Sequence, residues 1–112
     1  MAISDDDIEA LRVSLQESDS VPGADLIYEV SGVPEALNLA IGLSGYTSRI
    51  VIGSWYGSKS AAIALGGEAH RNRLRISTSQ VSTLAPELSG RWTKERRFAL
   101  CWDMLRRTMP QT

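Results

Sequence analysis

Two short segments place one serine and one glycine at the end of a largely apolar run of the sequence. The runs are DLIYE and RIV, and the residues that follow them are Val30, Ser31, Gly32, Ile52, Gly53 and Ser54. In an open α/β sheet, ligands bind just beyond the carboxyl ends of the strands. Glycine lets a backbone approach a ligand closely because it has no Cβ. The pattern therefore predicts a candidate ligand wall, although plain tight turns are the interpretation that these residues alone favour.

The other groups that could do chemistry are one histidine, His70, and one cysteine, Cys101. Glu68 is only two positions from His70, so a helix would not bring its carboxylate alongside the imidazole. We therefore expect a surface histidine. Cys101 follows Leu100 on the apolar side of an expected helix, which predicts a buried structural thiol. Carboxylates do not cluster at ligand spacing, so we expect no metal site and no catalytic residue.

The chain lacks the sequence signature of a dinucleotide phosphate site. G-x-G-x-x-G after a strand, followed about 20 residues later by an acidic residue, does not occur. Arginines and lysines gather near the C-terminus among Trp92, Phe98 and Trp102, a combination that can bind nucleic acid. These aromatic residues, however, follow the stripe that a protein core requires, so we expect a solvated basic face and no nucleic-acid partner.

The elements that would position these residues alternate between helix and strand. Ser4 and Asp7 match a capping box, and Pro34 suits the first turn of a helix. Runs with few polar residues are typical of strands in a parallel sheet. The expected helices cover residues 5–17, 34–44 and 93–107, and the expected strands cover residues 24–30, 49–55 and 74–79. Residues 68–73 could add a helical turn. This order predicts an α/β fold with a three-stranded, mainly parallel sheet flanked by helices.

Composition sets broad limits on the class of protein. The 112 residues are 43% hydrophobic and 22% charged, with a net charge of −1. These values are typical of one globular domain and do not favour binding to nucleic acid or to an anionic membrane. The N-terminus is acidic and no apolar run reaches 18 residues, so the sequence predicts a cytoplasmic protein without membrane contact.

Longer phrases of the sequence carry a family resemblance. SGVPEAL, GSWYG, LGGEAHR and SQVSTLAPELS occur in this order between Asp6 and Arg107. Together they resemble the medium-chain, zinc-type alcohol dehydrogenase family and its zinc-binding dehydrogenase members. The resemblance implies that residues 1–112 form a partial NAD(P)-binding Rossmann-like domain, namely its second half with the fourth, fifth and sixth strands. The zinc ligands, the glycine fingerprint and the acidic ribose ligand of the family have no counterpart here.

The resemblance also implies roles for the two segments at the strand ends. In the family, residues at these positions contact the nicotinamide riboside. The implied cofactor-binding residues are Val30, Ser31, Gly32, Ile52, Gly53 and Ser54. We therefore expect a truncated dehydrogenase-like protein, an oxidoreductase by descent, with weak binding of NAD or NADP. We expect neither zinc nor autonomous dehydrogenase activity, because hydride transfer in this family needs both a held nicotinamide and a zinc-bound alcohol.

The missing half of the domain predicts an exposed sheet edge. Strand 24–30 would lose its family neighbour, and an unpaired edge is a template for pairing with another chain. We expect a homo-oligomer formed through an edge strand. Two alternatives to a plain dehydrogenase fragment remain. The chain is one half of a split dehydrogenase completed by a partner chain, or it is a non-catalytic dimeric interaction module.

Overall fold

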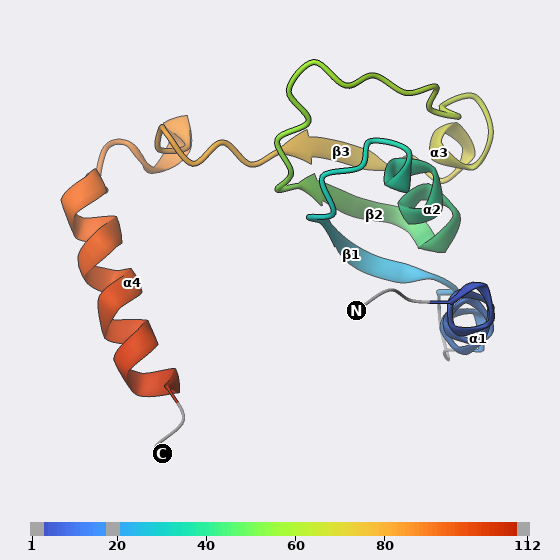
Figure 1. Cartoon of the computed structure of the whole chain (residues 1–112), viewed down its shortest axis with the longest axis horizontal. Coiled ribbons are helices and arrows are strands. Elements are labelled where there is room, and N and C mark those ends of the chain that lie inside the picture. Colours follow the sequence, from blue (N-terminus) through green and yellow to red (C-terminus); the bar gives the residue numbers. More distant parts are fainter. Residues whose placement is uncertain (1–3, 18–20, 110–112) are drawn as a thin grey trace. The chain divides into compact units, whose positions relative to one another are not determined.

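The computed structural model describes residues 4–17 and 21–109, which divide into two compact units. The first unit is Met1–Ser79 and the second is Gln80–Thr112. Helices and a sheet make up the first unit (Figure 1), and the second contains a short 3₁₀ helix and one long α-helix. Among the described residues, no helix is both long and apolar enough to cross a membrane.

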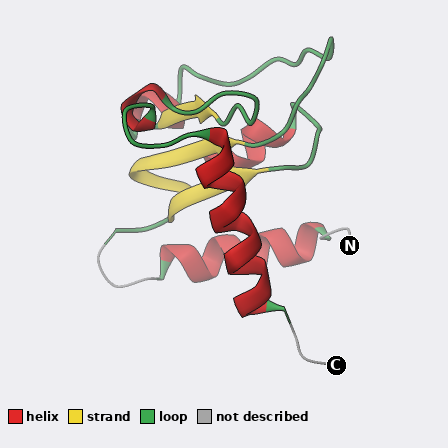
Figure 2. Ribbon diagram, turned by 90° about the vertical axis from the view of Figure 1, so that its left-hand side faces the viewer, coloured by secondary structure: helices red, strands yellow, loops and turns green. Residues whose placement is uncertain are grey.

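A parallel sheet of three strands organises the first unit. The strands are β1 (Ala24–Glu29), β2 (Ser44–Ile52) and β3 (Arg75–Thr78), and their order in the sheet follows the sequence. They lie side by side (Figure 2), and both pairs are parallel. The crossovers contain α2 (Ala36–Leu43) and α3 (Glu68–Arg71). The predicted α/β class with a three-stranded parallel sheet flanked by helices is confirmed.

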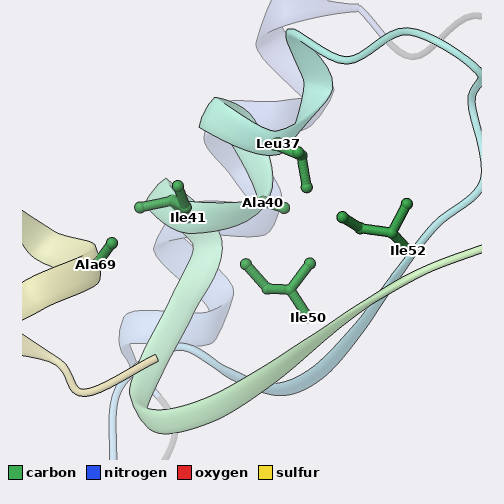
Figure 3. Packing of buried hydrophobic residues seen from close by; sticks show 6 residues of the cluster. All are labelled: Leu37, Ala40, Ile41, Ile50, Ile52 and Ala69. Carbon is green, nitrogen blue, oxygen red and sulfur yellow. The ribbon is translucent and has the colours of Figure 1, made fainter. Parts of the chain in front are cut away.

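The core lies between α2 and one face of the sheet. Leu37, Ala40 and Ile41 share the buried side of α2, at the i, i+3 and i+4 spacing of one helix face. In Figure 3, Leu37 points toward the β2 side chains Ile50 and Ile52, and Ile41 points toward Ala69 of α3. The Ile50 side chain is fully buried at 0% exposure. Alternate residues of a strand face the same side, so Ile52 joins Ile50 in this core. This packing holds the last residues of β2 against α2 and so positions the carboxyl end of the strand.

Strand β2 begins earlier than predicted, because Ser44 follows α2 directly. Gly45 is of the residue type that often ends a helix, which predicts a helix stop at this position, but that prediction is wrong because Gly45 lies inside β2. Pairing with β1 is irregular here: the register jumps between the pairs Ala24–Ser44 and Leu26–Arg49. Thr47 adopts a positive φ of 60°, and its backbone N–H donates to the Asn72 carbonyl at 2.6 Å. The irregular part of β2 is thus hydrogen-bonded to the backbone of Asn72, a residue far along the chain.

Strand β2 also ends earlier than predicted, at Ile52 instead of residue 55. The next two backbone N–H groups, of Gly53 and Ser54, both turn onto the Glu29 carbonyl. The Trp55 side chain is left exposed beyond this turn. The bounds of the other predicted elements agree with the structure within two residues, including α1 (Asp5–Gln16) with its capping box from Ser4 and Asp7.

The second unit contains the 3₁₀ helix η1 (Pro86–Leu88) and α4 (Lys94–Thr108), which Thr93 caps. The stripe of Phe98, Trp102 and Leu105 is exposed, each side chain by about half or more. Cys101 is exposed as well, so the expectation of a buried thiol was wrong. An amphipathic pattern shows which helix face is apolar, but burial requires a second surface to pack against it.

Candidate functional site

The carboxyl ends of β1 and β2 meet at one edge of the sheet, and both predicted site segments lie there. Glu29 is level with Ile52 in the parallel register. The Glu29 carbonyl accepts the N–H of Gly53 at 2.9 Å and that of Ser54 at 3.2 Å. The Gly32 N–H in turn donates to the Ser54 Oγ at 2.9 Å. Hydrogen bonds therefore join the two segments, which lie 22 residues apart in sequence.

The six predicted site residues differ in what they present at this edge. Val30 and Ser31 are exposed, whereas the Ile52 side chain belongs to the core. A Cβ added to Gly53 would come within 3.0 Å of Val30 Cγ1. Gly32 has a φ of +78°, and nothing lies within 4 Å of the place where its Cβ would be. Open space therefore adjoins the Gly32 backbone.

Glu29, which the sequence reasoning passed over, is the centre of this edge. Its side chain is only 5% exposed. One carboxylate oxygen, Oε1, accepts the Ser31 backbone N–H at 2.7 Å and also the Ser31 hydroxyl. The other, Oε2, accepts the Tyr56 hydroxyl. Through its carboxylate and its carbonyl, Glu29 contacts both segments and the loop that follows β2.

These contacts set the ionisation of the buried groups. Burial by itself raises the pKa of Glu29, but hydrogen bonds from Ser31, Tyr56 and Ser54 outweigh it and lower this pKa from 4.5 to about 2. Desolvation, followed by the hydrogen bond to Glu29 and its negative charge, raises the pKa of Tyr56 to about 12. Glu29 is therefore a carboxylate and Tyr56 a neutral phenol across the ordinary pH range.

A lysine also reaches this edge. The Lys59 ammonium donates to the Gly32 carbonyl at 3.1 Å, and the residue is otherwise exposed. An ammonium carries three N–H donors, so two of them are left for solvent or for an anionic group of a ligand. With Ser31, Gly32 and Ser54, Lys59 completes a polar rim above the buried Glu29.

The polar groups at this edge are backbone and hydroxyl hydrogen-bonding groups and one ammonium, which are groups of the kind that orient a ligand. His70 is exposed, as predicted, on α3. Within residues 4–17 and 21–109, no three histidine, cysteine, aspartate or glutamate side chains gather where they could hold a metal ion. A hollow of about 260 Å³ lies elsewhere in this unit, where α1 meets the segment from Val21 to Gly23.

One signal in the sequence could have identified Glu29. It is the only polar residue between Leu26 and Val30, and it lies two positions after Ile27, on the face that packs against α2. A carboxylate at such a position requires internal hydrogen bonds. Its partner Tyr56 lies 27 residues further along the chain, so the strand pattern alone does not reveal the pair.

Comparison with proteins of known function identifies dehydrogenases. A curated D-guloside 3-dehydrogenase of Escherichia coli (strain K12) is 31% identical over 83 residues, which are 74% of this chain and 24% of the relative. The D-guloside 3-dehydrogenase of Shigella flexneri matches equally well. No family model matches the chain. The chain thus spans about a quarter of the length of these curated relatives.

Solved structures with a similar fold are also dehydrogenases. Benzyl alcohol dehydrogenase from Acinetobacter calcoaceticus aligns with a TM-score of 0.60 and 14% identity, covering 90% of this chain and 25% of that one. Galactitol-1-phosphate dehydrogenase from Escherichia coli aligns with a TM-score of 0.58 and 18% identity, covering 97% and 28%. At these identities the likeness shows the fold: the chain has the Rossmann-like α/β arrangement found in part of these enzymes.

Proposed function

We propose that this chain is part of a zinc-type alcohol dehydrogenase-like protein, an oxidoreductase by descent, and that its strand ends form the nicotinamide side of an NAD(P) site. The observation that carries the proposal is the hydrogen bond from the Gly32 N–H to the Ser54 Oγ, at 2.9 Å. It holds the two segments together at the edge where α/β sheets bind ligands. The similarity to dehydrogenases supports the same assignment.

The residues present fit one part of such a cofactor. Open space beside the Gly32 backbone admits a flat ring or a ribose without displacing a Cβ. Ser31 and Lys59 would offer a hydroxyl and ammonium donors to polar groups of the ligand. When bound, the nicotinamide supplies the hydride chemistry, while these residues bind and orient it.

The phosphate side of the cofactor has no comparable support. The sequence lacks the glycine fingerprint that cradles a pyrophosphate at a helix N-terminus. We therefore propose that the chain alone binds NAD or NADP weakly, holds no zinc and does not transfer hydride by itself.

Isothermal titration of NADH and NADPH into the purified chain tests this proposal. We expect a dissociation constant between about 100 μM and a few millimolar, the range of about −5.5 to −3.5 kcal/mol. Ser54→Ala removes the acceptor of the Gly32 N–H and should weaken binding severalfold. Ser89→Ala is the matched control, because the Ser89 hydroxyl bonds only the Pro86 carbonyl in the second unit. Absence of heat at 5–10 mM cofactor, on the order of the weakest useful site, would contradict the proposal.

A second function is favoured by the outer edge of the sheet. Within the described part of the chain, β1 pairs on one side, with β2. One face of β1 carries Leu26 and Tyr28, and Val30 follows directly after the strand. Tyr28 is 65% exposed and Val30 is 73% exposed. An unpaired apolar edge strand is a template for strand addition. We propose that another chain pairs here, either a second copy, as in a dimeric interaction module, or a separate chain that completes a dehydrogenase.

Two measurements separate these alternatives. Light scattering reports whether the chain alone forms a dimer. Co-expression with the remaining segments of a related dehydrogenase, followed by an assay of alcohol-dependent NAD reduction, reports whether the pair becomes active. Restored activity favours the split enzyme, and a stable dimer that remains inactive in the presence of those segments favours the interaction module.

A further inference from the structure

Glu29 carries a buried negative charge that only neutral groups stabilise. Its carboxylate accepts hydrogen bonds from the Ser31 N–H, the Ser31 hydroxyl and the Tyr56 hydroxyl. None of these donors carries a charge. Among residues 4–17 and 21–109, the structure gives Glu29 no ion-pair partner within 4.0 Å. The hydrogen bonds keep the carboxylate ionised, and its charge is not cancelled.

This charge lies directly below the proposed ligand surface. Ser31 donates its backbone N–H to the Glu29 carboxylate, and Ser54 donates its N–H and its hydroxyl to the Glu29 carbonyl. The Gly32 N–H in turn donates to the Ser54 Oγ. A charge that is 5% exposed is screened weakly by solvent. Its field therefore extends outward through the edge formed by Ser31, Gly32 and Ser54.

The two redox states of a nicotinamide differ by one positive charge on the ring. The oxidised ring is a pyridinium cation and the reduced dihydropyridine ring is neutral, while the rest of the cofactor is the same. A fixed anion near the ring therefore attracts the oxidised form and has little effect on the reduced form. Unit charges several ångströms apart at an effective dielectric constant of about 20 interact strongly enough for about a tenfold preference.

We propose that Glu29 is a selectivity residue, which makes this sheet edge prefer a cationic nicotinamide ring over the neutral reduced ring. The inference rests on the proposed cofactor site and adds to it the charge of the ligand that the site favours. Lys59 acts in the opposite direction, because its ammonium lies at the same edge, on the Gly32 carbonyl. Lys59 is exposed, so solvent screens its charge more strongly than that of Glu29.

The test compares the dissociation constants of NAD⁺ and NADH for the full chain and three variants, by calorimetry at low salt. We expect the wild-type ratio of NADH to NAD⁺ dissociation constants to fall about tenfold in Glu29→Gln. Gln is nearly isosteric with Glu and removes the charge. Lys59→Gln should raise the ratio severalfold, because it removes a positive charge from the same edge. This variant changes an exposed side chain, so it tests the effect of charge at the edge even if Glu29→Gln does not fold. Ser89→Ala should leave the ratio unchanged.

The ratio separates charge selectivity from a purely structural role. Loss of turn geometry would weaken NAD⁺ and NADH equally, so the ratio would stay constant while both constants rise. Binding of both forms with an unchanged ratio in Glu29→Gln and Lys59→Gln overturns the inference and leaves the proposed function standing. Absence of binding of either form to the wild-type chain overturns both.

Discussion

Glu29 and Tyr56 make the stability of the fold depend on pH at both ends of the scale. The pKa of Glu29 is lowered to about 2, so its contribution is fully present above the unfolded value of 4.5 and is lost as the pH falls from 4.5 through 2. At 1.36 kcal/mol per pKa unit, the shift corresponds to about 3 kcal/mol. The pKa of Tyr56 is raised to about 12, so its contribution is lost as the pH rises from 10 through 12.

Urea unfolding at a series of pH values measures this dependence. We expect the free energy of unfolding to fall steeply below about pH 4.5 in the wild type. Glu29→Gln should have a lower free energy of unfolding at pH 7 and a flatter acid limb. Tyr56→Phe should lose the alkaline limb between pH 10 and 12. It should also flatten the acid limb in part, because it removes one of the hydrogen bonds that lower the pKa of Glu29. Parallel acid limbs for the wild type and Glu29→Gln would show that other carboxylates control the transition.

Two glycines with positive φ should respond differently to a methyl group. Gly32 has open space around its missing Cβ, so Gly32→Ala should cost about 1 kcal/mol of unfolding free energy from the backbone conformation. A Cβ at Gly23, with φ +98°, would lie 2.5 Å from the backbone N of Gly45. We expect Gly23→Ala to cost about 3 kcal/mol or more, since backbone must move. Thermal unfolding of both variants measures this difference.

At the residue scale, the sequence predicts where the site residues lie better than it predicts which residues form hydrogen bonds with one another. The segments at Val30–Gly32 and Ile52–Ser54 lie together because the ends of adjacent parallel strands meet, which the alternation of elements predicts. The role of Glu29 depends on Tyr56, a residue of the following loop. Loop conformation is set by tertiary packing, and no periodic pattern in the sequence encodes it.

Between elements, the contact of α2 with β2 carries the core of the first unit. Ile50 is fully buried beneath Leu37 and Ile41, whereas Ile76 of β3 is 37% exposed. We expect Ile50→Ala to lower the free energy of unfolding by about 4 kcal/mol, through lost burial and the cavity it leaves. Ile76→Ala, the matched control, should cost about half as much or less. Equal effects in chemical denaturation would mean that the packing against α2 does not dominate the core.

Local signals explain which element boundaries could be predicted. The capping box of Ser4 and Asp7 fixes the start of α1, and both residues lie at the N-terminal end of that helix. The start of β2 depends instead on β1, because Ser44 pairs with Ala24. Its end depends on the Glu29 carbonyl of a neighbouring strand. Such bonds across the fold override the local preference of Gly45 to end a helix.

At the scale of the whole molecule, the apolar surfaces that the described residues leave exposed need explanation. A monomeric protein rarely leaves large contiguous apolar patches in water. Here one face of β1 exposes Leu26, Tyr28 and Val30, and the apolar stripe of α4 is exposed within its own unit. The curated relatives are about three times as long as this chain, and we propose that segments equivalent to their remaining residues are one source of cover. A second copy of the chain is the other.

The edge of β1 should therefore drive self-association of the isolated chain. Tyr28 is 65% exposed on β1, whose outer edge has no paired strand among residues 4–17 and 21–109. A charged lysine at an edge strand opposes pairing with another strand, because its ammonium would lose water. We expect light scattering to give a mass above 12.2 kDa that grows with concentration for the wild type, and a monomer for Tyr28→Lys. Val81→Lys is the control, since Val81 is also exposed, at 76%, but lies outside the sheet. If the wild type stays monomeric up to millimolar concentration, β1 does not drive self-association. We then expect a different chain to cover its apolar face.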